Sequence, residues 1–278
     1  MKLFKSLAIA ACAVCSLTAC GGTDGPTAAP VVSSFTATPS NIYVGQSSVL
    51  TWTVTGADTV TIDQGVTVAA SATSTSVTLN ATTTYTLTAK NAAGTTTKTA
   101  TVTVIKWDTA NAINTWLEGK TLVMTGADIP THPNGYTENM NLGASTQCYN
   151  KTTIAVLSGN FNVTSKLGTL NGAPNVGNVG VCDRATVKGS DVVFSSNAVL
   201  VANVQGNAAC FDVTVTYTGF SQEGRGKIAA DGKTVVMELF FGGQATGHRC
   251  ADGAVGASTV ILKSVAFTGN AQQTYRIQ

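Results

Sequence analysis

The sequence predicts an all-β protein made of two strand-rich domains. Apolar residues alternate with threonine over long stretches, as in 50–54 (LTWTV) and 100–104 (ATVTV). This period of two is typical of strands with one buried face. Glycine and other turn-forming residues interrupt the stretches at short intervals. Only 11% of the residues are charged, and the abundant valine and threonine favour strands over helices.

The first twenty residues have the pattern of an export leader. Lys2 and Lys5 precede an uncharged run from 6 to 19, which is shorter than the roughly 20 apolar residues of a transmembrane helix. Residues 17–20 (LTAC) resemble the lipobox of bacterial lipoproteins. The resemblance implies that 1–19 is a signal peptide, that cleavage occurs before Cys20, and that Cys20 carries the lipid. The alternative is an ordinary signal peptide in which Cys20 is incidental.

The lipobox resemblance also implies a location. Two or three acyl chains would hold the protein firmly on a membrane, whereas one chain holds only marginally. In that family an Asp after the Cys favours retention in the inner membrane, so Gly21 indicates the outer membrane. Residues 20–30, rich in glycine and small residues, are predicted to be a flexible tether.

Charge and metal-ligating residues exclude several classes of function. Loss of Lys2 and Lys5 leaves 14 basic and 14 acidic residues, and a neutral chain argues against binding to nucleic acid. A neutral chain also lacks the basic surface that binds anionic lipids, so the expected membrane contact is made by the lipid on Cys20. With two histidines and no C-x-x-C motif, the sequence predicts no metal site. No motif for a cofactor is present.

The stretch 31–105 is predicted to be a β-sandwich, with threonine at 22 of its 75 positions. Its segment 82–94 (TTTYTLTAKNAAG) resembles the F strand and following turn of immunoglobulin-like domains. The resemblance places Tyr85 at the tyrosine corner and Leu87 at the position of the second cysteine, with Trp52 replacing the first. It implies a cysteine-free immunoglobulin-like module, which is more often a spacer or an adhesive module than a catalyst.

The stretch 106–278 is predicted to be a larger antiparallel β domain that begins with one short helix. The helix has Asp108 as N-cap, an apolar stripe at helical spacing and Gly119 as its end. The Asp231–Gly232 pair predicts a type I′ hairpin. The stripe residues are Ala112, Ile113, Trp116 and Leu117, and the candidate strands are 120–125, 152–158, 160–167, 185–194, 198–204, 211–218, 226–230, 234–241, 258–267 and 273–277.

A short helix followed by meandering strands favours a closed or nearly closed barrel, with a sandwich as the alternative. On strand 211–218 the residues expected to point inward are Phe211, Val213, Val215 and Tyr217. The segment 118–122 (EGKTL) and the closing Tyr275–Arg276 resemble lipocalin-like domains, and the tryptophan expected near Gly119 is absent. The resemblance implies a barrel and identifies no binding residue.

Four cysteines of the second domain are predicted to form two disulfides, because an even number in an exported chain is typical of such a framework. Three connectivities are open, and proximity in sequence favours pairing Cys148 with Cys182 and Cys210 with Cys250. Metal binding by these cysteines is the alternative.

Two long loops, 130–150 and 168–182, are the expected recognition surface. Long loops are either functional or poorly ordered, and the disulfides beside these two favour order. Aromatic and amide side chains suit sugar or peptide recognition, and the alternative is ordinary surface-loop composition. The candidate recognition residues are Tyr136, Asn139, Tyr149 and Asn175.

Two glutamates and two histidines raise the question of catalysis. Glu238 interrupts an apolar strand and Glu118 lies next to a tight turn, so each is either a solvated carboxylate or a buried acid with a raised pKa. Two such acids in one cleft would make a glycosidase pair. His132 and His248 are loop residues unless the fold brings them beside Glu138 or Asp252. The segment 219–224 (GFSQEG) is interpreted as a polar loop rather than a nucleophile elbow.

Three hypotheses of function follow. The first is a lipid-anchored envelope protein, not an enzyme, whose immunoglobulin-like spacer presents a β domain to an extracytoplasmic partner or glycan. The second is a lipocalin-like binder of a small apolar ligand, which needs an enclosed cavity of several hundred Å³. The third is an envelope hydrolase, which needs a histidine or two carboxylates converging in one cleft.

Overall fold

The computed structural model describes residues 28–69, 71–130, 148–171, 181–257, 259–262, 264–266 and 271–278. Within them the chain is built of strands with one α-helix, so the predicted all-β class is confirmed. The described chain divides into two compact units.

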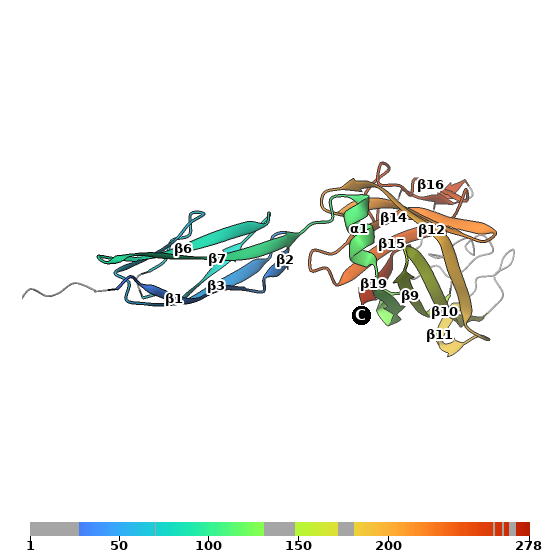
Figure 1. Ribbon diagram of the computed structural model, residues 1–278. Helices are drawn as coiled ribbons and strands as arrows, with labels where there is room; N and C mark the ends of the chain where they lie inside the picture. Colours follow the sequence, from blue (N-terminus) through green and yellow to red (C-terminus); the bar gives the residue numbers. More distant parts are fainter. Residues whose placement is uncertain are drawn as a thin grey trace, which may run out of the picture. The chain divides into compact units, whose positions relative to one another are not determined.

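The first seven strands form two sheets that bury one face each (Figure 1). In β3 the apolar residues Leu50 and Trp52 are buried, whereas the neighbouring Thr51 and Thr53 are exposed, as the alternation predicts. Tyr85 and Leu87 on β6 are buried as well. One sheet contains β1 (Val31–Thr38), β3 (Ser47–Thr55) and β5 (Ser74–Thr78), and the other contains β2 (Asn41–Tyr43), β7 (Gly94–Ile105), β6 (Thr83–Asn91) and β4 (Thr59–Ile62).

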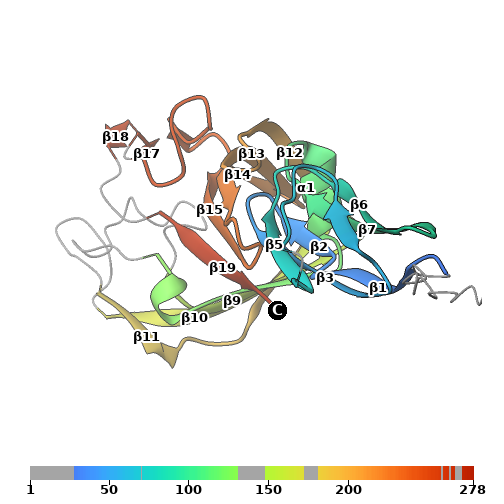
Figure 2. The ribbon, with the colours of Figure 1, turned by 90° about the vertical axis from the view of Figure 1, so that its left-hand side faces the viewer.

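The strands of the second domain close into an eight-stranded antiparallel barrel, which decides between the predicted barrel and sandwich (Figures 1 and 2). Closure depends on β9, because it pairs with both β8 and β10. In order round the ring the strands are β10 (Asn160–Asn171), β12 (Val192–Gln205), β13 (Cys210–Tyr217), β14 (Phe220–Ile228), β15 (Thr234–Phe241), β19 (Gln273–Ile277), β8 (Thr121–Thr125) and β9 (Tyr149–Leu157).

Four short strands lie outside this ring. Strand β11 (Val181–Val187) pairs with the last residues of β10. The long connection between β15 and β19 carries the other three, and Figure 2 shows β17 and β18 beside the ring. These three are β16 (Ala245–Thr246), β17 (Ile261–Leu262) and β18 (Val265–Ala266).

Alternating side chains fill the barrel. The four residues of β13 that were predicted to point inward are all buried in its main apolar cluster. Gly226 on the neighbouring strand makes room for one of them, because a Cβ at 226 would stand 2.7 Å from the Phe211 ring. Large rings and small residues thus complement each other inside the barrel, as a densely packed interior requires.

Helix α1 (Ala110–Leu117) lies where it was predicted, with one correction at its start. Its N-cap is Thr109 rather than Asp108, since Oγ1 of Thr109 accepts a hydrogen bond of 3.1 Å from the Ala112 N–H. The helix buries Ile113 and Leu117 in the barrel cluster. A 3-10 turn, η1 (Gly126–Asp128), follows β8.

Two strand predictions and one loop prediction are corrected. The predicted strand 185–194 contains the end of β11, a turn at 188–191 and the start of β12. Within the described residues of the predicted strand 258–267, only the two-residue strands β17 and β18 are formed. The stretch 219–224 is not a loop, because all of its residues after Gly219 belong to β14, which begins at Phe220.

The hairpin at Asp231–Gly232 exists but is not of type I′. Only Gly232 has a positive φ, of 63°, whereas a type I′ turn needs two such residues. The Gly232 N–H donates to the Ala229 carbonyl at 2.9 Å, and the Ala229 N–H donates to the Thr234 carbonyl at 2.9 Å. The loop is therefore four residues long and joins β14 to β15.

Candidate functional site

The proposed lipidation site and three of the four candidate recognition residues lie outside the described residues. This holds for Cys20, and for Tyr136, Asn139 and Asn175 of the expected recognition loops. It also holds for His132 and Glu138. Tyr149 is described, and it is not a surface loop residue. It is the first residue of β9, is 8% exposed, and belongs to the apolar cluster of the barrel.

Both predicted disulfides are present, so that connectivity is confirmed and the four cysteines are not free for a metal. Cys148 is bonded to Cys182 and links the start of β9 to β11. Cys210 is bonded to Cys250 and links the start of β13 to the connection between β15 and β19. The Cα atoms are 5.6 Å and 5.8 Å apart, which is the usual separation.

A small cavity lies inside the barrel, toward the end at which β13 turns into β14. Its volume is about 30 Å³, enough for about two water molecules. The opposite end is the one next to α1, because the Glu118 carboxylate at the end of the helix accepts hydrogen bonds from the Ser158 and Gly159 N–H groups in the β9–β10 turn. The cavity is therefore at the end of the barrel away from the helix.

Hydroxyl and amide groups line part of this cavity, and none of its lining residues is an acid or a base. The hydroxyls of Thr152 and Ser165 are 3.1 Å apart and share a hydrogen bond. The Tyr275 hydroxyl donates to Oε1 of Gln273 at 2.6 Å. Burial raises the pKa of Tyr217 to about 12, so this phenol stays neutral at physiological pH. The cavity therefore suits an uncharged group that can form hydrogen bonds.

Four aromatic rings form a cluster at the same end, which we call the aromatic rim: Phe194, Tyr217, Phe220 and Phe241. Tyr217 and Phe220 are stacked with ring centroids 4.6 Å apart. Phe194 packs edge-on against Phe220, at 5.6 Å, and Phe241 does the same from the other side at 5.6 Å. Phe194 is 38% exposed, so part of the rim is open to solvent.

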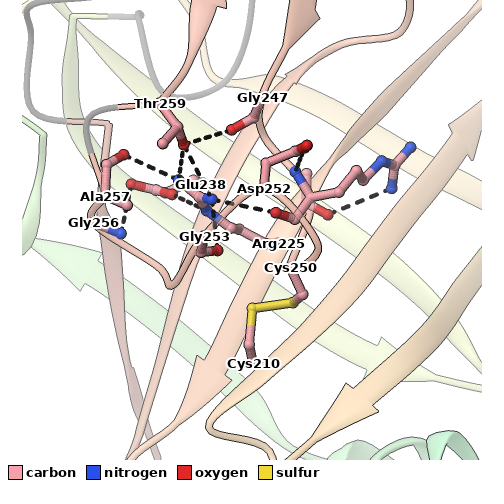
Figure 3. A network of polar contacts seen from close by, with 12 residues as sticks. Cys210, Arg225, Glu238, Gly247, Cys250, Asp252, Gly253, Gly256, Ala257 and Thr259 are labelled. Carbon is pink, nitrogen blue, oxygen red and sulfur yellow. Dashed lines mark hydrogen bonds and ion pairs between the residues drawn. A yellow bond between two sulfur atoms is a disulfide. The ribbon is translucent and has the colours of Figure 1, made fainter.

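A second cluster of polar groups lies on the outer face of the barrel, between β14, β15 and the connection that follows β15 (Figure 3). Nε of Arg225 donates to Oε2 of Glu238 at 2.7 Å, and the two residues are 0% and 3% exposed. Of the two interpretations offered for Glu238, the solvated carboxylate is therefore wrong. It is half of a buried ion pair.

Arg225 also holds the covering segment, residues 249–257, in place. Its guanidinium donates to the carbonyl oxygens of Gly253 at 2.7 Å and Ala257 at 3.1 Å. Figure 3 shows these bonds converging on Arg225, with the Cys210–Cys250 disulfide on one side. The other oxygen of Glu238 accepts from the Gly256 N–H at 3.0 Å. Because each charged atom has a partner, the cluster is suited to stabilising the fold.

The two glutamates do not form a pair of catalytic carboxylates. Glu118 is bound to backbone N–H groups at the end of the helix, and Glu238 is bound to Arg225 on the outer face of the barrel. His248 does lie near acidic groups, with Nε2 at 3.8 Å from Oε1 of Glu223. It is only 6% exposed, so a substrate has no direct approach to its ring.

Sequence reasoning missed Arg225, although a signal for it was present. Counting outward from the four-residue loop of the β14–β15 hairpin pairs Arg225 with Glu238, and this is the register found. An arginine and a glutamate facing each other on neighbouring strands, one of them interrupting an apolar run, indicate an ion pair.

The described residues contain neither a metal-binding cluster nor a membrane-spanning helix. No group of three or more histidine, cysteine or acidic residues is placed to hold a metal ion. Among the same residues no helix has the length and apolar character needed to cross a membrane. In comparisons with known proteins, no protein family, no curated protein and no solved structure matches this chain.

Proposed function

We propose that the protein is a lipid-anchored component of the cell envelope in which the sandwich is a spacer and the barrel binds an extracytoplasmic partner or glycan. The observation that carries the binding role is the aromatic rim beside an uncharged, polar-lined cavity. Partly exposed aromatic rings with hydroxyl and amide groups beside them are typical of sites for neutral, hydrogen-bonding ligands.

The size of the cavity favours recognition at the rim over enclosure of an apolar ligand. A lipocalin-like site for a small molecule occupies several hundred Å³. The described cavity offers about 30 Å³, and the rest of the interior is filled by the main apolar cluster. A ligand would therefore contact the rings from outside and extend no more than a small group inward.

The proposed spacer role of the sandwich is supported by its composition and its packing. Two sheets of three and four strands enclose Trp52, Tyr85 and Leu87, the residues that carry the resemblance to immunoglobulin-like domains. The sandwich contains only four charged residues, Asp58, Asp63, Lys90 and Lys98. The family assignment, the signal peptide at 1–19 and the outer-membrane location remain proposals that rest on the sequence.

Replacing Cys20 by serine tests the anchor. The serine has no thiol to receive the diacylglycerol, so the protein is expected to move from the membrane pellet to the soluble extract of the envelope. Fractionation followed by intact-mass measurement gives the readout, and Cys15→Ser serves as the matched control that should stay in the pellet. Continued pelleting of the Cys20→Ser protein, or an intact mass without acyl groups in the unaltered protein, would contradict the proposal.

Replacing Phe194 by alanine tests the aromatic rim. Calorimetric titration of the full chain in detergent with a panel of neutral oligosaccharides from the envelope is expected to identify one that binds. The Phe194→Ala variant should bind that oligosaccharide with a Kd about tenfold higher, which is a loss of about 1.4 kcal/mol in binding free energy. The matched control is Val193→Ala, because Val193 is the adjacent residue on β12, is 66% exposed and does not line the cavity. Equal losses in both variants, or no binding by the unaltered chain, would argue against this site.

A further inference from the structure

His248 is a buried base that the proposed function does not use. The residue is 6% exposed, and its ring packs edge-on against the Phe240 ring with centroids 6.2 Å apart. Neither Nδ1 nor Nε2 has a hydrogen-bond partner among the described residues. A buried polar atom without a partner has lost its hydrogen bonds to water and gained none in return, so this position is unfavourable even for a neutral imidazole.

A proton on the ring would make the position less favourable still. Two cations face His248, Arg249 on its own segment and Arg225 on β14, and two anions, Glu223 on β14 and Asp252, oppose them. Glu223 is already occupied, because its carboxylate binds the Arg249 guanidinium and the Gly243 N–H. From β15 the contact is the uncharged Phe240 ring. Burial, followed by the charge of Arg249, lowers the pKa of His248 below its ordinary value.

The chain on the two sides of His248 is held to very different degrees. From Arg249 onward it is fixed by the disulfide, by the Arg225 bonds, and by the Cys250 N–H, which donates to Asp212 at 2.7 Å. The preceding stretch, 243–248, is held by the Gly243 N–H bond to Glu223, the pairing of β16 with β17, and a 2.8 Å bond from the Thr259 hydroxyl to the Gly247 carbonyl. This stretch can therefore open while Arg249 and Cys250 stay in place.

We propose that His248 is an acid-sensitive latch, which keeps residues 243–248 closed on the outer face of the barrel while its ring is neutral and releases them when the ring takes up a proton from solvent. Release uncovers an apolar cluster that this stretch helps to bury. Its members are Phe240, Ala245, Val260, Leu262 and Ala271. Acidification would therefore expose a small apolar surface beside an intact barrel.

The sign of the effect follows from proton linkage. In the open state His248 has an ordinary pKa near 6.5, and in the closed state its pKa is lower. The closed state is therefore fully favoured above about pH 6.5 and loses stability as the pH falls toward the closed-state pKa. Because opening takes up one proton, the opening equilibrium constant rises up to about tenfold for each pH unit in that window.

Hydrogen exchange of the full chain at pH 7.5 and at pH 5.5, corrected for intrinsic exchange rates, tests the latch. The amides of 243–248 are expected to exchange several-fold faster at the lower pH, while those of β13 do not change. His248→Phe should abolish the dependence on pH, because phenylalanine fills the same space and does not titrate. His132→Phe is the matched control and should retain it, since these two are the only histidines of the chain.

Exchange in 243–248 that is independent of pH in the unaltered protein, or that stays dependent on pH in His248→Phe, overturns the latch. If that variant does not fold, an NMR titration of the His248 ring in the unaltered protein decides the matter. A pKa above 6.5 would mean that protonated His248 pairs with Glu223 and closes the stretch, and a pKa below 6.5 agrees with release.

Discussion

Replacing Arg225 by methionine is expected to destabilise the barrel by about 3–5 kcal/mol, the largest effect of any single substitution considered for this protein. The change removes the only cation bonded to the Glu238 carboxylate within the described residues and leaves that carboxylate buried. It also removes the donor for the Gly253 and Ala257 carbonyl oxygens. The covering segment should therefore loosen before the barrel unfolds.

Native-state hydrogen exchange of the β13 and β14 amides in increasing denaturant measures this loss for the barrel alone. The matched control is Lys227→Met, on the same strand and the same face, which should change stability by less than about 0.5 kcal/mol. A double variant, Arg225→Met with Glu238→Leu, should recover part of the loss, because no charge is left unpaired. Recovery should be incomplete, since the carbonyl groups of the covering segment still lack a donor. A loss below about 1 kcal/mol in Arg225→Met would refute the role given to this ion pair.

Replacing Cys210 and Cys250 together by alanine is expected to lower the stability of the barrel by about 4 kcal/mol, which is the loop-closure entropy for their separation of 40 residues. Both cysteines are buried in a small cluster with Val236 and Val255, so the variant also loses apolar contacts between the covering segment and the barrel. The same exchange experiment gives the readout.

The other disulfide offers the comparison. Removing Cys148 and Cys182, separated by 34 residues, should cost a similar amount by the entropy of the loop alone. Only the Cys210–Cys250 variant should speed exchange in 249–257, because of the two disulfides only Cys210–Cys250 is attached to the covering segment. Equal exchange of 249–257 in both variants would show that Arg225 alone is sufficient to hold it.

Local patterns predicted the strands well, because each strand carries its own alternation. The inward residues of β13, the helix at 110–117 and both disulfides were all predicted from short stretches of sequence. The hairpin register that pairs Arg225 with Glu238 was predictable in the same way, because it depends on nearby residues. The ion pair was missed because Glu238 was considered without its cross-strand neighbour.

Features that depend on distant residues were not predictable. The barrel closes partly through the pairing of Leu122 with Ile277, two residues separated by most of the domain, and no periodicity encodes that contact. The burial of Tyr149 depends on strands that enter the barrel much later in the chain. The aromatic rim likewise joins one residue from each of four strands, and only Tyr217 among them was predicted to point inward. For the same reason the covering segment could be recognised only from the fold.

The surface of the sandwich has a consequence for how neighbouring molecules meet. Threonine hydroxyls cover the exposed faces of its strands, and some bind one another, as Thr84 and Thr101 do at 2.9 Å. Hydroxyl groups neither titrate nor gather counterions, and the two acids and two bases of the sandwich cancel in net charge. Crowded copies would thus neither attract nor repel one another over distance, and their spacing would be governed by steric contact and hydration at any ionic strength.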